Sequence, residues 1–395
     1  MRRSLVALFA CASGLSVANV YYAQPLLDAL AADFAIRPAA VGGVITATQA
    51  GSVLALLLLV PLGDRIDRRR LMLAQLLVLA AALVGVACAR DATAMMAGML
   101  AIGLLGTAMT QGLVAYAAAA SAASERGRVV GAAQAGVVAG LLLARALAGW
   151  VADMAGWRAV YGGSALAMLA LSALLWLSLP RLATPDQAKA QLPYLSLIGS
   201  MFALLCSDRV LQVRGVIALL MFAAFGILWS ALVLPLAAPP HNYSHTAIGA
   251  FGLVGCTGTL AAARAGRWAD RGWGQRTSAA ALLLMLLAWL PLWLGAQGSG
   301  PLSLAALVAG ILALDLGVQA LQVTNQQMIF SGGTATHSRL VACYMLFYAV
   351  GSGGGAIAAT SVYALAGWSG VCLLGGAVSL AALLFWAASL PRPAY

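Results

Sequence analysis

Long apolar runs separated by short polar segments occupy most of this sequence. A membrane-spanning helix needs about 20 apolar residues to cross a hydrocarbon layer about 30 Å thick. Twelve runs reach that length, at residues 5–30, 41–62, 71–89, 93–120, 129–152, 159–179, 215–238, 246–265, 277–296, 302–330, 340–366 and 369–390. The pattern predicts an all-α polytopic membrane protein with twelve transmembrane helices. An even number of spans puts both termini on the same side of the membrane.

The amino-acid composition agrees with this class. Apolar residues make up 63% of the chain and charged residues 8%, whereas soluble proteins have roughly half and a quarter. A soluble core could not bury that much apolar surface. The six cysteines have no metal-binding or redox spacing, and no phosphate-binding loop ends in Gly-Lys-Ser/Thr. We therefore expect no metal, no cofactor and no ATP hydrolysis.

The net charge of +11 comes from 22 basic and 11 acidic residues, and its distribution predicts orientation. The arginines lie in short loops between apolar runs, which is typical of cytoplasmic loops and not of a nucleic-acid-binding surface. With a cytoplasmic N-terminus, only Arg37, Arg90 and Arg158 fall outside, while the inside loops hold most of the others, Arg209 and Arg214 included. We expect an inner-membrane protein with both termini in the cytoplasm and no nucleic-acid partner.

Two segments need a separate interpretation. Residues 1–18 resemble a secretory signal, but cleavage would leave an odd number of spans and put the most basic loops outside, so we expect a retained helix. Residues 181–214 form the longest inside connection, and Tyr194 to Cys206 within it is apolar but too short to cross. This predicts an amphipathic helix on the inner surface. The linker separates two six-helix halves, residues 1–180 and 215–395.

Two pairs of short motifs recur at similar offsets. Asp64-Arg65 follows the second span and Asp270-Arg271 follows the eighth, 206 positions later. Gly156-Trp157 closes the fifth span and Gly367-Trp368 closes the eleventh, 211 positions later. These offsets predict two parallel, pseudo-symmetric repeats of six helices.

At these loops the chain resembles a transporter of the major facilitator superfamily, whose motif reads Gly-x-x-x-Asp-Arg-x-Gly-Arg-Arg. The first copy matches at Asp64, Arg65, Arg68 and Arg69, with Val60 and Asp67 in place of the two glycines. The second copy matches at Gly266, Asp270, Arg271 and Arg276. The resemblance covers the whole chain and implies the superfamily fold.

In that superfamily the motif acid and arginines hold the two halves together on the cytoplasmic side. The resemblance implies this switch role for Asp64 with Arg65, Arg68 and Arg69. For Asp270, Arg271 and Arg276, a switch role and a role in fixing topology stay equally open.

Rows of small residues on the second, fifth, eighth and eleventh spans predict close helix packing. The rows are Ala47, Gly51 and Ala55; Gly136 and Gly140; Gly252, Gly255 and Gly258; and Gly351, Gly355 and Ala359. The resemblance implies that these spans line the interface between halves. The fifth span, with Gly131 and Gly149, resembles the glycine-rich region of drug and metabolite:proton antiporters, although the antiporter proline is absent.

Ionisable residues inside a span are expensive and are therefore functional candidates. Asp315 in the tenth span and Arg145 in the fifth are such residues, and we expect Asp315 to carry a coupling proton with Arg145 as its charge partner in at least one conformation. A permanent ion pair and separate amide partners are the alternatives. Asp28, near the outer end of the first span, is either a third coupling candidate or an acid at a helix end.

Uncharged polar and aromatic residues give candidates for the substrate cavity. Gln319, Gln322 and Gln326 share one helix face with Asp315. The full set is Asn19, Tyr22, Gln24, Gln111, Trp229, Gln319, Gln322, Asn325 and Gln326. Ordinary interhelical hydrogen bonding is the alternative for each amide. The three histidines fall in connecting loops and receive no role.

The sequence thus predicts a secondary active transporter that is not an enzyme. We expect a small-molecule substrate, coupling to protons, the lipid bilayer as the environment and a monomeric state. Proton-coupled export of small organic compounds is the first hypothesis, because of the resemblance to antiporters. Proton-coupled uptake by symport is the alternative, since one fold serves both directions.

Overall fold

A computed structural model describes residues 3–63, 65–122, 124–179, 194–255, 264–265, 267–268, 271–298, 300–330 and 337–390. Regular structure within these ranges is helical, without a strand. Ten helical segments there are long and apolar enough to cross a membrane. One of them, Arg339–Ala388, contains two predicted spans, and the eighth predicted span begins in the shorter apolar helix His245–Val254. The predicted all-α polytopic fold is confirmed.

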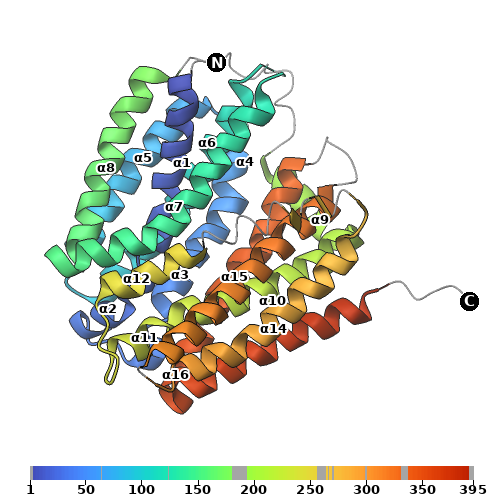
Figure 1. Ribbon diagram of the computed structural model, residues 1–395. Coiled ribbons are helices and arrows are strands. Elements are labelled where there is room, and N and C mark those ends of the chain that lie inside the picture. Colours follow the sequence, from blue (N-terminus) through green and yellow to red (C-terminus); the bar gives the residue numbers. More distant parts are fainter. Residues whose placement is uncertain are drawn as a thin grey trace, which may run out of the picture. The chain divides into compact units, whose positions relative to one another are not determined.

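The chain forms two compact units, each described by itself. Unit 1 comprises Met1–Ile36, Ala47–Ser200 and Ser244–Ala250. Its long helices are α1 (Arg3–Tyr21), α5 (Arg68–Ala87), α6 (Ala92–Ala119), α7 (Arg126–Ala155) and α8 (Trp157–Ser178). Shorter elements are η1 (Gln24–Leu26), α2 (Leu27–Asp33), the end of α3 (Gly43–Leu54), the π-helical turn η3 (Ala55–Leu59) and α4 (Val60–Leu62). Helix α1 packs against α6 and α7, and α5 packs against α6 and α8 (Figure 1).

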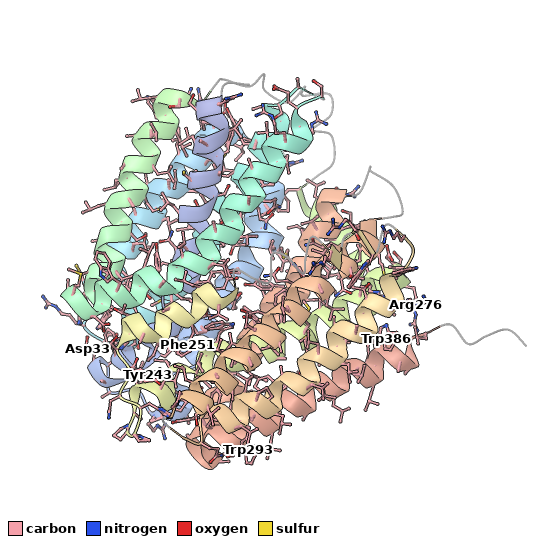
Figure 2. The ribbon with its side chains drawn as sticks, in the orientation of Figure 1. Asp33, Tyr243, Phe251, Arg276, Trp293 and Trp386 are labelled. Atoms are coloured by element: carbon pink, nitrogen blue, oxygen red, sulfur yellow. The ribbon has the colours of Figure 1, made fainter. Side chains whose placement is uncertain are left out.

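Unit 2 comprises Arg37–Thr46, Met201–Tyr243 and Phe251–Tyr395. It contains η2 (Pro38–Ala40), α10 (Arg209–Ala231), α11 (Val233–Ala237), α14 (Gly274–Gly295), α15 (Pro301–Phe330) and α16 (His337–Ala388). Helix α10 packs against α15 and α16, and α14 packs against the same two helices. Figure 2 shows Arg276 and Trp386 at one end of this unit and Trp293 at the other, so tryptophans flank the apolar stretch of α14 as at a membrane interface.

Aspartates begin several of these helices. The Asp67 carboxylate accepts a hydrogen bond from the backbone N–H of Arg70 at 2.9 Å, and Asp91 accepts one from Ala94 at 2.8 Å. A carboxylate at this position satisfies an N–H that lacks a partner within the helix and interacts favourably with the helix dipole. The sequence therefore fixes the starts of α5 and α6 locally.

Glycines let helices of the same unit approach to backbone contact. A Cβ atom added at Gly140 of α7 would lie 2.2 Å from the carbonyl oxygen of Gly14 in α1. In the same way Gly51 packs on α6 at Leu100, and Gly355 of α16 packs on α10 at Ala223. Three of the four small-residue rows therefore make contacts inside a unit, in addition to any role between halves that the resemblance implies. The last member of the fourth row, Gly258, lies outside the described residues.

Two one-residue turns confirm the internal similarity of the Gly-Trp motifs. Gly156 joins α7 to α8 with φ 80° and ψ 163°. Gly367 breaks α16 between its two membrane-crossing parts with φ 62° and ψ −160°. Both values lie in a backbone region that essentially only glycine occupies. The following tryptophans each donate a hydrogen bond inside their own unit, Trp157 to Asp33 and Trp368 to the carbonyl of Leu292, both at 3.0 Å.

Each unit includes a short segment from the other predicted half. In unit 2 the backbone N–H of Gly42 donates to Thr360 Oγ1 at 3.1 Å, and Thr46 Oγ1 donates to the carbonyl of Gly353 at 2.8 Å. In unit 1 the segment Ser244–Ala250, which includes the start of α12 (His245–Val254), packs on α7. A Cβ atom at Gly149 would lie 2.0 Å from the carbonyl oxygen of His245, so this contact is as close as those between the long helices.

Candidate functional site

The basic loop after α4 is tied to neighbouring helices of unit 1. Arg68 donates to the carbonyls of Gly63 at 3.0 Å and of Ala115 in α6 at 3.3 Å. The guanidinium of Arg69 donates to the carbonyl of Trp176 in α8 and lies 5.1 Å from the centroid of its ring. Arg65 is exposed, and Asp64 lies outside the described residues. The switch role of the loop stays a prediction.

The second motif loop is only partly described. Arg271 and Arg276 are exposed, and the Arg276 guanidinium lies 6.0 Å from the centroid of the Trp273 ring. Asp270 falls outside the described residues. For this copy of the motif, both the switch role and the topological role stay predictions.

Helix α15 carries the predicted polar face of unit 2. Asp315 lies in the middle of this helix, and 5% of its surface is exposed. Gln319, Gln322 and Gln326 are half-buried, and Gln322 accepts a hydrogen bond from the Tyr344 hydroxyl at 2.6 Å. A carboxyl group and three amides therefore follow one another along α15.

Asn325, one of the predicted cavity residues, contacts a buried arginine. It is fully buried, and its Oδ1 accepts from Arg214 at 3.3 Å. Arg214 also donates to Ser278 at 2.8 Å and to Gln275 at 2.9 Å, both in α14. The guanidinium thus joins α10, α14 and α15 through uncharged partners.

The prediction that Arg214 lies in a cytoplasmic loop was wrong. Helix α10 begins at Arg209, six residues before the expected start of the seventh span, and 3% of Arg214 is exposed. Asp208 caps this helix by accepting from the N–H of Leu211 at 3.0 Å. An aspartate directly before an apolar run is a recognised N-cap signal, and it could have located the true start.

Aromatic residues of unit 2 form one cluster around α10. Trp229 is 3% exposed, and its ring centroid lies 6.2 Å from that of Phe225. Phe222 lies edge-on to Tyr348 with centroids 4.4 Å apart. These contacts give the predicted cavity residue Trp229 aromatic neighbours within its own unit, as packing or as a binding surface.

In unit 1, Arg145 and Gln24 meet. Arg145 is 2% exposed, and its Nε donates to Gln24 Oε1 at 2.6 Å. Its guanidinium carbon lies 5.5 Å from the centroid of the Tyr21 ring. Asp315 belongs to unit 2, so the predicted pairing of Arg145 with Asp315 stays a prediction.

The other predicted cavity residues of unit 1 have different surroundings. Asn19 accepts from Ser164 of α8 at 2.7 Å and donates to the carbonyl of Leu15 at 2.8 Å, so both ends of its amide have partners. This matches the alternative of interhelical bonding. Tyr22 is buried and Gln111 is half-buried.

A charged cluster that the sequence did not predict lies at the start of α12. His245 Nε2 is 3.2 Å from both oxygens of Asp28, and its Nδ1 is 3.0 Å from Asp153 Oδ1. Asp153 also accepts from the backbone N–H groups of His245 at 3.1 Å and of Thr246 at 2.7 Å. The three side chains are about one quarter exposed, at 24% for His245, 27% for Asp28 and 26% for Asp153. Asp28 thus has a specific partner, and His245 has a defined environment.

Comparison with known proteins explains the fold. The family description of the Major Facilitator Superfamily matches residues 8–336. The chain belongs to the Major Facilitator Superfamily. The chain is 40% identical to the "Uncharacterized transporter YgaY" of Escherichia coli O157:H7, over 97% of this chain and 95% of that one. It is 31% identical to the "Probable transporter SCO4007" of Streptomyces coelicolor, over 99% and 88% of the two chains.

Solved structures of the superfamily share the fold. A point mutant of the nucleoside transporter NupG matches with a TM-score of 0.75 and 15% identity, over 97% of this chain and 100% of that one. At this identity the likeness concerns the fold alone. Together the family match, the transporter relatives and the apolar helices make this protein a multi-pass membrane transporter of the Major Facilitator Superfamily with its twelve-helix fold.

Proposed function

We propose that this transporter exports small organic compounds in exchange for protons by alternating access. The observation that carries the proposal is Asp315, a carboxyl group that is 5% exposed in the middle of α15. It lies 14 residues after Pro301, or about 20 Å along the helix at 1.5 Å per residue, close to the centre of a membrane.

A carboxyl group at this depth can exchange a proton during transport. Low-dielectric surroundings favour the neutral acid, whereas a nearby guanidinium favours the carboxylate. Arg145 is a buried guanidinium and is our proposed charge partner in at least one conformation. Alternation between these two environments would let Asp315 bind a proton on one side and release it on the other.

The remaining polar residues favour an organic substrate. The three glutamines after Asp315 offer donors and acceptors, and the aromatic cluster around Trp229 offers an apolar wall. An apolar surface with a few oriented polar groups is the usual character of a small-molecule site. The glycine-rich α7, with its resemblance to antiporters, supports export over uptake.

Transport in proteoliposomes tests this function. We expect substrate that leaves the lumen down its own gradient to acidify the lumen, as reported by an internal pH-sensitive dye, because protons enter in exchange. An imposed pH gradient should likewise drive the substrate in the opposite direction to the protons. Alkalinisation of the lumen would instead establish the uptake symport. A substrate that moves without any change in internal pH contradicts proton coupling.

We also propose an inner-membrane location with both termini in the cytoplasm, a monomer, and two six-helix halves. The halves follow the predicted bounds, 1–180 and 215–395, except that α10 extends the second half back to Arg209 and shortens the linker accordingly. Helix α9 (Tyr194–Ser207) includes the apolar part of this linker and would lie on the inner membrane surface.

Cysteine labelling tests the orientation. Arg65 and Arg90 are exposed and lie before and after α5, so they are on opposite sides of the membrane in any orientation. In a background without native cysteines, Arg65→Cys should resist an impermeant thiol reagent in intact cells, whereas Arg90→Cys should react. The reverse result would overturn the proposed topology.

A further inference from the structure

The cluster of Asp28, His245 and Asp153 requires a proton. Each ring nitrogen of His245 faces a carboxylate oxygen, Nε2 at 3.2 Å from Asp28 and Nδ1 at 3.0 Å from Asp153. A neutral imidazole has one N–H and one lone pair, so it can donate to only one of the two carboxylates. The other contact would then bring a lone pair against a carboxylate. Both contacts are favourable only when the cluster holds one more proton, and the imidazole is the more basic group.

The same cluster holds a short chain segment in place. Asp28 belongs to α2 and Asp153 to the end of α7, whereas His245 begins the segment Ser244–Ala250. Asp153 caps this segment through the N–H groups of His245 and Thr246, and Thr246 Oγ1 donates to it at 2.6 Å. Removal of the segment from α2 and α7 would separate the histidine from both carboxylates at once.

We infer that Asp28, His245 and Asp153 form a second proton-binding site, which holds its proton while Ser244–Ala250 is docked on unit 1 and releases it when the segment leaves. On release, an N–H bond of the imidazolium breaks, its electron pair stays on the ring nitrogen, and the proton passes to water. The quarter exposure of all three side chains gives water access to the cluster. In the orientation proposed above, this water is on the outer side.

The charged groups around the cluster do not replace this proton. From α7, Arg145 faces the segment with its backbone carbonyl, close to Gly249, and its Nε bonds to Gln24. From α2, Asp33 pairs with Arg158 of α8. The segment Ser244–Ala250 itself has no other charged residue. The cluster therefore has two carboxylates and one imidazole, and its net charge is −1 with the proton bound and −2 without it.

The effect of pH has a definite sign. His245 precedes the predicted span, and its pKa is raised to about 9. The hydrogen bond to the Asp28 carboxylate contributes most to this increase, the negative charge of Asp28 and the contact with Asp153 add to it, and partial burial opposes it. The docked segment thus binds a proton that a free histidine, with a pKa of about 6.5, releases. The equilibrium constant for docking is therefore largest below about pH 6.5. It falls about tenfold for each pH unit between about pH 6.5 and about pH 9.

The distance between α7 and the segment tests this inference. Met154 and Ala247 are exposed positions for paired spin labels in the full-length protein without native cysteines. The docked state gives a short distance between the two labels and the undocked state a long one. The ratio of the docked to the undocked population should fall by at least about tenfold between about pH 6 and about pH 9.5. His245→Gln should abolish this change and lower the ratio at about pH 6. A pH-independent ratio in the wild-type sequence, or the same change in His245→Gln, overturns the inference.

Three further variants sharpen the result. Asp28→Asn should weaken the pH dependence without removing it, because a neutral histidine can still donate to Asp153 while the Asp153 carboxylate still favours the imidazolium. This variant decides the matter if His245→Gln does not fold, and an unweakened response would contradict the inference. The matched control His241→Gln, at a histidine four positions earlier in the sequence and outside the cluster, should keep the wild-type response. Asp315→Asn should keep it as well, so that failure of the proposed proton carrier and failure of this site are distinguishable.

Discussion

Asp315→Asn should abolish transport driven by a pH gradient while substrate binding survives. The amide has nearly the same shape as the carboxyl group but cannot bind and release a proton in this pH range. Asp315 is a buried carboxyl group in the middle of α15, so this variant removes the proposed proton carrier itself. We expect loss of at least about a hundredfold in pH-driven flux in proteoliposomes, which is typical for removal of an essential proton-transfer group. Substrate binding is measured in parallel by calorimetry.

The matched control is the same substitution at a helix cap. Asp91 caps α6 by accepting from the N–H of Ala94, and asparagine caps helices about as well as aspartate. Asp91→Asn should therefore transport normally. If Asp315→Asn still couples substrate flux to protons, Asp315 is not the carrier and the proposed mechanism fails.

Gly140→Ala should destabilise the folded protein, and Gly140→Leu should prevent its folding. The added Cβ would lie 2.2 Å from the carbonyl oxygen and 2.5 Å from the Cα atom of Gly14. Both are backbone atoms of α1, so the contact can be relieved only by moving one whole helix. We expect the alanine substitution to lower the free energy of unfolding by about 3 kcal/mol. In detergent, the midpoint temperature, at which half of the monodisperse protein is lost on heating, should therefore be lower than for the wild-type protein.

Gly131 provides an internal control on the same helix α7. A Cβ atom there would have no neighbour within 4 Å. Alanine is preferred over glycine in a helix by about 1 kcal/mol. Gly131→Ala should therefore leave the midpoint unchanged or raise it. A Gly140→Ala protein as stable as Gly131→Ala would show that α1 and α7 do not pack through backbone contact.

The membrane spans could be predicted because bilayer thickness sets the length of an apolar helix, and the chain breaks its apolar runs with charge or glycine. Gly367 illustrates this, since it separates two spans that otherwise continue as one helix, Arg339–Ala388. The fold family could be predicted from the paired loops around Asp64 and Asp270. The roles of Asp315, Arg145 and the glutamines of α15 stay predictions.

Long-range polar contacts could not be predicted from one sequence. His245 lies 217 positions from Asp28 and 92 from Asp153, and no local pattern relates these residues. The position of Arg214 was predicted wrongly because the rule that places arginines in cytoplasmic loops assumes that each arginine is exposed to water. Its uncharged partners Ser278, Gln275 and Asn325 come from α14 and α15, which only the packed helices of unit 2 bring near.

The one-residue turns at Gly156 and Gly367 also bear on how the chain enters the membrane. A single glycine connects α7 and α8, so this connection is too short for one helix to lie in the bilayer while the other lies in water. The same holds for the two arms of α16. We therefore expect each pair to enter the bilayer as a helical hairpin rather than as two helices inserted one after the other.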